Sequence, residues 1–132
     1  MDMKDLVFSR LGPASKSLND ASDLLTHQIA QVEGALAELR LGVPAWIDLA
    51  TMEVEAAPDW YVELGYDKQK GRWAMLLAQG PDPEVYTFSF LLDASREMKL
   101  QALEKIPDLL AKLREEAGKL ESQILTAVST VE

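Results

Sequence analysis

The amino-acid sequence predicts an α+β fold in the order α-ββββ-α. This is a long N-terminal helix, an antiparallel meander of three to four strands, and a C-terminal helix. Eight of the nine aromatic residues lie between Trp46 and Phe90, and aromatic side chains favour a half-buried sheet. The segments on either side are rich in Ala, Leu, Glu, Lys and Gln, which favour helices. A length of 132 residues is typical of one domain, so we predict a single domain over residues 1–132.

The N-terminal helix is predicted over about residues 15–41. Apolar residues recur there at spacings of four and three, which places them on one face of a helix. They are Leu25, Ile29, Val32, Leu36 and Leu39. Gly42 and Pro44 then end the helix, because Gly favours a left-handed cap and Pro cannot continue the hydrogen-bond ladder. Residues 6–11 can form a short separate helical turn.

The C-terminal flank shows the same pattern with Pro107 inside it. Proline removes one helical hydrogen bond, so we expect either a kink or two helices over about residues 94–105 and 107–131. The second part repeats apolar residues over about three heptads. They include Leu110, Leu113, Leu120 and Ile124.

The sheet is predicted over about residues 47–92. We expect a hairpin with a four-residue loop at 68–71, which would pair Tyr66 with Trp73 and Leu64 with Met75. A later strand over 85–91 places Tyr86, Phe88 and Phe90 on one side. An earlier strand over 49–55, with Met52 and Val54 facing inward, is less clear from the sequence.

The helices are longer than the sheet is wide. A helix of 25 residues is about 37 Å long, whereas four strands span only about 19 Å. An uncovered apolar stripe of that length exceeds what soluble monomers tolerate, so the helices need a partner. We expect them to pair antiparallel within one chain or to pack across a homodimer, and the sequence leaves both arrangements open.

The charge of the chain excludes some partners. The net charge is −9, which disfavours nucleic acid and an anionic membrane surface, because both bind through Lys and Arg. Residues 45–92 carry −5 of this charge. Glu53, Glu55 and Glu63 would share an acidic sheet face that could meet a protein with a basic surface. The chain has no Cys, no secretory signal and no apolar run long enough for a membrane span, so we expect a cytoplasmic protein.

The residues that carry chemistry form no catalytic pattern. His27 is two residues after Leu25 and should point away from the apolar face into solvent. With Asp20 and Asp23 it could make only a weak metal site, because exposed ligands without supporting hydrogen bonds bind poorly. Neither a nucleophile elbow nor a phosphate-binding loop occurs. We therefore predict no enzyme activity, no cofactor and no metal.

Two functions fit these observations. The first is a non-enzymatic protein-interaction module, adaptor or chaperone-like, that self-associates as a homodimer through the heptad-patterned helices. The alternative is a small-ligand binding domain with an apolar aromatic cavity between sheet and helix. The aromatic residues for such a pocket, or for a docking platform, are Trp46, Trp60, Trp73, Tyr86 and Phe88. No stretch resembles a family whose function could be carried over.

Overall fold

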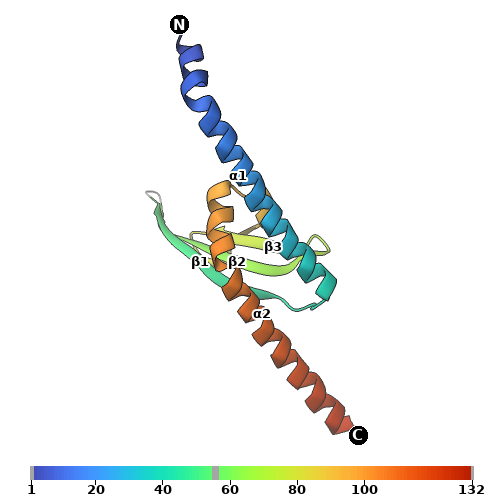
Figure 1. The fold of residues 1–132 in the computed structure, drawn as a ribbon. Coiled ribbons are helices and arrows are strands. Elements are labelled where there is room, and N and C mark those ends of the chain that lie inside the picture. The colour runs from blue at the N-terminus through green and yellow to red at the C-terminus, as the bar shows by residue number, and fades with distance from the viewer. Residues whose placement is uncertain (1, 55–56, 132) are drawn as a thin grey trace.

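A computed structural model describes residues 2–54 and 57–131, and the side chains of 2–49, 60–82 and 84–131. The predicted order of elements is confirmed (Figure 1). The helices are α1 (Met3–Leu39) and α2 (Arg96–Val131), and the strands are β1 (Ala45–Val54), β2 (Ala57–Gln69), β3 (Arg72–Gly80) and β4 (Thr87–Phe90). Two 3₁₀ turns, η1 (Pro83–Val85) and η2 (Leu91–Asp93), flank β4.

The four strands form one antiparallel sheet in the order β1-β2-β3-β4, and both helices lie on the same face of it (Figure 1). We call this the covered face and the opposite one the open face. The core between helices and sheet contains Val62, Leu64 and Tyr66 of β2 with Met75 and Leu77 of β3. These residues alternate along the two strands, so they share one face of the sheet, as the predicted hairpin requires.

Helix α1 begins twelve residues earlier than predicted. The Oδ1 atom of Asp2 accepts a hydrogen bond from the backbone N–H of Asp5 at 2.8 Å and caps the first turn. The helix then continues through Pro13, because a chain that is helical on both sides can lose one hydrogen bond without ending. At the other end, Arg40 and Gly42 adopt positive φ and stop the helix.

Helix α2 is continuous through Pro107, so of the two expected outcomes, a kink or two separate helices, the separate helices do not occur. Figure 1 shows that the first turns of α2 and its C-terminal half point in different directions. Its first turn is capped by Ser95, whose Oγ accepts a hydrogen bond from the N–H of Met98 at 3.3 Å.

The hairpin between β2 and β3 is tighter than predicted. Gln69 pairs with Arg72, and the loop contains only Lys70 and Gly71, both with positive φ. A two-residue type I′ turn has a twist that matches that of the strands, and it requires positive φ at both loop residues. Tyr66 therefore pairs with Met75 rather than with Trp73. The shift is two residues, so every side chain keeps its predicted face.

Strand β1 begins at Ala45, four residues before the predicted start. Its register shifts between Asp48 and Ala50, which leaves Leu49 as an extra residue, a β-bulge. The bulge interrupts the two-residue alternation, which explains why the sequence pattern showed only the later part of the strand. Met52 pairs with Trp60. The predicted inward positions of Met52 and Val54 concern side chains outside the described residues.

The two helices run parallel, so the predicted antiparallel pairing is wrong. Arg96 at the start of α2 donates a hydrogen bond to Asn19 at 3.5 Å, and Lys99 donates one to Thr26 at 3.0 Å. Residue numbers therefore increase in the same direction along both helices. An apolar stripe fits a neighbour in either direction, so periodicity alone did not determine the direction. As a result, the N- and C-terminal ends project from opposite sides of the molecule (Figure 1).

Candidate functional site

Five of the nine residues of the predicted association seam lie in the core of the chain itself. Ile29, Leu36 and Leu113 are buried, and Leu25 and Val32 pack against them. These five residues hold α1 and α2 on the covered face of the sheet. Of the two arrangements left open by the sequence, pairing within one chain is the correct one for this part of the seam.

The other predicted seam residues are exposed. The exposed fractions of Leu39, Leu110, Leu120 and Ile124 range from 41% to 67%. At Leu110 the prediction was wrong by one residue, because Leu109 is the buried one and Leu110 faces outward. Leu109 is four residues before Leu113 and shares its face, whereas Leu110 lies 100° further around the helix.

Each helix extends beyond the part of the chain that covers it (Figure 1). We call residues 3–18 the α1 arm and residues 118–131 the α2 arm. The α1 arm exposes about half of Val7, Leu11 and Leu18, and the α2 arm exposes Leu120 and Ile124. The sequence pattern contained this signal in the α1 arm, but the Gly12-Pro13 step suggested that the helix started later. Within residues 2–54 and 57–131, none of the helices has both the length and the apolar character needed to cross a bilayer.

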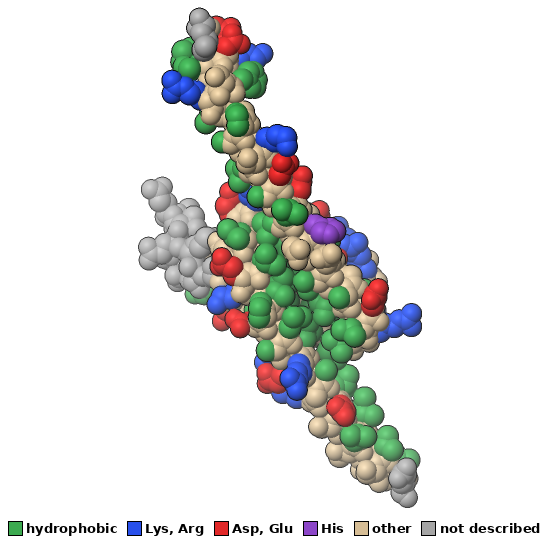
Figure 2. All heavy atoms as spheres, in the orientation of Figure 1, with side chains coloured by type: hydrophobic (Ala, Val, Ile, Leu, Met, Phe, Trp, Pro, Cys, Tyr) green, Lys and Arg blue, Asp and Glu red, His purple; other side chains and the backbone are tan. Residues whose placement is uncertain are grey.

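An apolar groove runs between the two helices where the α1 arm leaves the body. Its volume is about 540 Å³. It is lined mainly by leucines of both helices, and Figure 2 shows hydrophobic side chains gathered over this central part of the face. The leucines are Leu18, Leu24, Leu25, Leu100 and Leu103. The exposed apolar surface of the α1 arm is therefore continuous with the interior.

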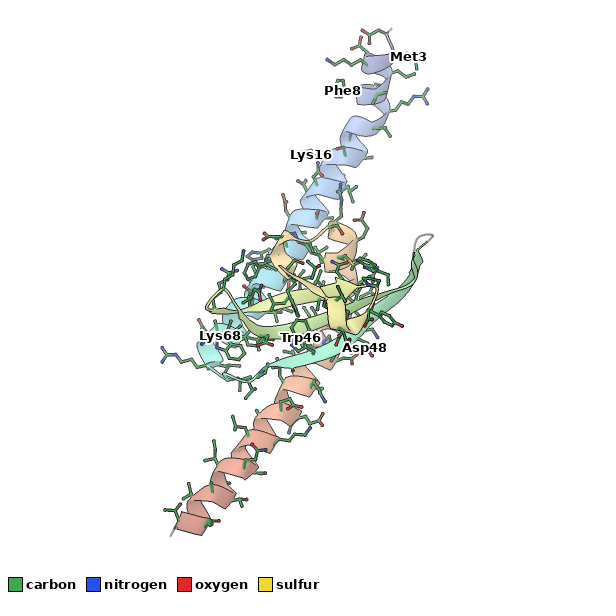
Figure 3. The ribbon with its side chains drawn as sticks, turned by 180° about the vertical axis from the view of Figure 1, so that it is seen from behind. Met3, Phe8, Lys16, Trp46, Asp48 and Lys68 are labelled. Atoms are coloured by element: carbon green, nitrogen blue, oxygen red, sulfur yellow. The ribbon has the colours of Figure 1, made fainter. Side chains whose placement is uncertain are left out.

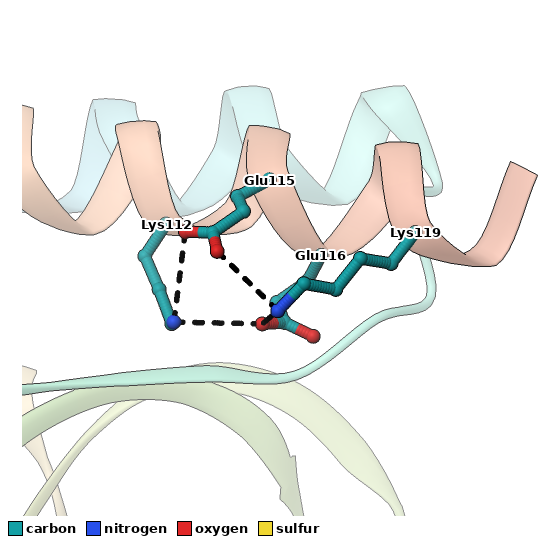
Figure 4. Close-up of polar contacts among 4 residues, drawn as sticks. All are labelled: Lys112, Glu115, Glu116 and Lys119. Atoms are coloured by element: carbon teal, nitrogen blue, oxygen red, sulfur yellow. Dashed lines mark hydrogen bonds and ion pairs between the residues drawn. The ribbon is translucent and has the colours of Figure 1, made fainter. Parts of the chain in front are cut away.

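A network of four charged residues marks the point where α2 leaves the body (Figure 4). The Nζ atom of Lys119 lies 3.3 Å from carboxylate oxygens of both Glu115 and Glu116, and Lys112 lies 3.6 Å from both. The hydrogen bond from Lys119, together with the charge of Lys112, lowers the pKa of Glu115. The same carboxylates raise the pKa of Lys119. All four residues are on one helix, so the network supports α2 locally.

The open face carries an aromatic layer that the sequence did not predict. Trp46 lies over Gly65, where a Cβ atom would overlap its ring, and it meets Phe88 edge to face at 5.8 Å. The Trp46 indole N–H donates a hydrogen bond to Asp67 at 3.1 Å. Figure 3 shows this face toward the viewer, with Trp46 and Asp48 labelled. Trp46 lies just before the predicted start of the sheet, but it is a half-buried residue of β1.

Two carboxylates stand opposite each other on this open face. Asp48 of β1 pairs directly with Glu63 of β2. Desolvation, a hydrogen bond to Glu63 and the charges of Glu63 and Asp48 raise the pKa of Tyr86 to about 12. Like charges in directly opposed positions destabilise a sheet. Of the predicted acidic face, Glu63 is placed as expected, while Glu55 and the side chain of Glu53 lie outside the described residues.

The sheet divides the predicted aromatic pocket into two groups. Trp60 and Trp73 pack against the core on the covered face, where Trp73 stacks on Tyr66 at 5.5 Å. Phe88 pairs with Ala78 and contacts Trp46 on the open face, and Tyr86 approaches Glu63 there. A single cavity lined by Trp60, Trp73, Tyr86 and Phe88 is therefore incorrect. The sequence did not reveal this division into two faces, because the division depends on the strand register and on the bulge in β1.

One polar contact joins α1 to the edge of β3. Strand β4 begins to pair with β3 only at Leu76, so the N–H of Met75 has no strand partner on that side. It donates a hydrogen bond to the Glu33 carboxylate at 3.0 Å. Burial and the charge of Glu33 also raise the pKa of Tyr66. Glu33 therefore fixes the position of α1 on the sheet.

His27 is exposed on α1, as predicted. In the part of the chain that the structure describes, no three His, Cys, Asp or Glu residues lie together as metal ligands would. Comparison with protein families, curated proteins and solved structures finds no match to this chain.

Proposed function

We propose that this protein is a non-enzymatic interaction module, adaptor or chaperone-like, that self-associates through its two helical arms. The observation that carries the proposal is the exposed apolar stripe on each arm, beyond the region where α1 and α2 cover each other. Stripes of this length on soluble proteins mark interaction surfaces. The homodimer expected from the sequence is the smallest assembly of this kind.

Sedimentation equilibrium tests the self-association. We expect the average mass of the wild-type chain to rise with concentration, and Leu120→Asp to reduce this rise. Leu120 is 41% exposed and lies outside the core, so the variant should keep the wild-type melting temperature when both proteins are dilute. Leu113 is unsuitable for this test, because it is 1% exposed and a charge there would unfold the body. A wild-type mass of one chain at several hundred micromolar would refute the proposal.

We also propose that the open face receives a basic segment of another protein. Asp48 and Glu63 face each other there, with the Trp46 and Tyr86 rings beside them. A guanidinium group placed between the carboxylates would relieve their repulsion and could stack on an aromatic ring.

An arginine-rich peptide is the probe for this second surface. We expect its binding, measured by calorimetry, to weaken with salt and to fall at least tenfold in Asp48→Asn/Glu63→Gln. The matched control is Asp93→Asn/Glu97→Gln, which removes two exposed charges elsewhere. Equal losses in both variants would show only a general response to net charge.

A further inference from the structure

We infer that the protein assembles head to tail, with the α1 arm of one copy packed in parallel beside the α2 arm of the next. The inference rests on the self-association proposed above and specifies which surfaces meet. It follows from the phase of the apolar stripes, the lengths of the helices and the charges of the arms.

The stripe on the α1 arm continues a face that is already packed in the body. Leu11 and Leu18 precede Leu25 at intervals of seven residues, which is two helical turns, so all three share one face. In the body, Leu25 and Ile29 on this face pack against the core. The arm therefore presents to solvent the surface that binds the sheet and α2 further along the same helix.

The α2 arm has the same property. Leu120 follows Leu113 and Ile106 at intervals of seven residues, and Val131 follows Ile124 in the same way. Leu113 and Ile106 are buried against the core, whereas Leu120, Ile124 and Val131 are exposed. Each arm therefore lacks a neighbour of the kind that the rest of its helix already has.

With these helix lengths, the α1 arm of one copy can lie beside the α2 arm of another copy. α1 has 37 residues and α2 has 36, and they lie parallel with Asn19 beside Arg96. A second copy displaced along the helices by one helix length, about 55 Å, brings its α1 arm beside the α2 arm of the first. The arms are similar in length, 16 residues for 3–18 and 14 for 118–131, so the parallel pairing of the body continues into the next molecule.

Charge favours this pairing over contact between two α1 arms. The α1 arm carries Lys4, Arg10 and Lys16 against Asp5, a net charge of +2. In the α2 arm, Lys119 and Glu121 cancel. Two α1 arms would bring +4 together, whereas an α1 arm beside an α2 arm meets a surface without net charge.

The contact must be weak. A pair of four-turn helices buries less than the roughly 1,200 Å² at the lower limit of standard interfaces. A head-to-tail contact also leaves one free arm at each end of the assembly. The assembly therefore continues to grow unless the rotation between neighbouring copies closes it into a ring. We therefore expect masses above that of a dimer at high concentration.

Two double variants test the inference by complementation. Val7→Asp/Leu11→Asp disables the α1 arm, and Leu120→Asp/Ile124→Asp disables the α2 arm. We expect each to be monomeric alone in sedimentation velocity, because neither provides both surfaces. Their equimolar mixture should form a complex of two chains and nothing larger, because one intact α1 arm meets one intact α2 arm.

Ser9→Asp and Ser122→Asp are the matched controls. Each places one aspartate on the opposite side of its arm, and we expect both to assemble like the wild type. Circular dichroism checks that the arms remain helical. If an aspartate variant loses helix, Val7→Ser/Leu11→Ser and Leu120→Ser/Ile124→Ser replace it.

The possible failures are distinguishable. If the wild type self-associates and either arm variant does so equally well alone, like arms or other surfaces pair, and only the head-to-tail inference is wrong. A mixture that stays monomeric also refutes it. If the wild type is monomeric at several hundred micromolar, the proposed self-association is wrong as well.

Discussion

The two halves of α2 have the same apolar spacing and different surroundings. Before residue 117, Ala102, Ile106, Leu109 and Leu113 are buried against α1 and the sheet. After it, Leu120 and Ile124 occupy the same face and are exposed. Periodicity therefore specifies which face of a helix needs a neighbour, but it does not say whether that neighbour belongs to the same chain.

Alanine substitutions at equivalent positions of the two halves should give the largest contrast. Leu113→Ala removes a fully packed side chain, and we expect it to lower the free energy of unfolding by about 2–5 kcal/mol. Leu120→Ala should change it by no more than about 0.5 kcal/mol, because its side chain is 41% exposed and lies outside the core. Urea unfolding of dilute protein measures both. Equal losses would mean that the α2 arm packs against its own chain.

A similar contrast on α1 concerns the hydrogen bond between Glu33 and the sheet. Glu33→Ala leaves the Met75 N–H without its acceptor, and we expect a loss of about 1–3 kcal/mol. Glu33→Gln keeps an acceptor oxygen and should lose less. The control is Glu38→Ala on the exposed side of the same helix, with an expected change within about 0.5 kcal/mol. Equal effects at positions 33 and 38 would contradict an anchoring role for Glu33.

The sequence predicted the order of elements and the covered face correctly, because both follow from periodicity that Ile29, Leu64 and Leu113 display plainly. It did not predict the direction of α2, which depends on the turn at η2 and the Ser95 cap. It also missed the aromatic layer on the open face. There, Trp46 covers Gly65 across strands, so the relevant neighbours are 19 positions apart and depend on a register that includes the Leu49 bulge.

The smallest expected effect concerns the ion pairs at the border between the two halves of α2. The pKa of Glu115 is below its ordinary 4.5, so its stabilisation is present above pH 4.5 and is lost as pH falls through the lowered pKa. The pKa of Lys119 is above 10.5, so its stabilisation is present below pH 10.5 and is lost as pH rises through the raised pKa.

We therefore expect the helical circular dichroism signal of the dilute protein to be constant between pH 4.5 and pH 10.5 and slightly weaker at the two extremes of pH. In Glu115→Gln the acid-side change should shrink, and salt should weaken it in the wild type because the residues are exposed. An acid-side change of the same size in Glu115→Gln would show that other carboxylates cause it.

The parallel helices also determine when α1 can be covered during synthesis. Its contacts with α2 join residues 77 and 73 positions apart in the chain. The strands can pair as they emerge, since each contacts the next along the chain, but Ile29 and Leu36 must wait for the final third of the polypeptide. Contacts this distant slow folding, and an uncovered apolar helix invites association before folding is complete. The growing chain thus contains the apolar helix α1 well before it contains α2, the helix that covers it.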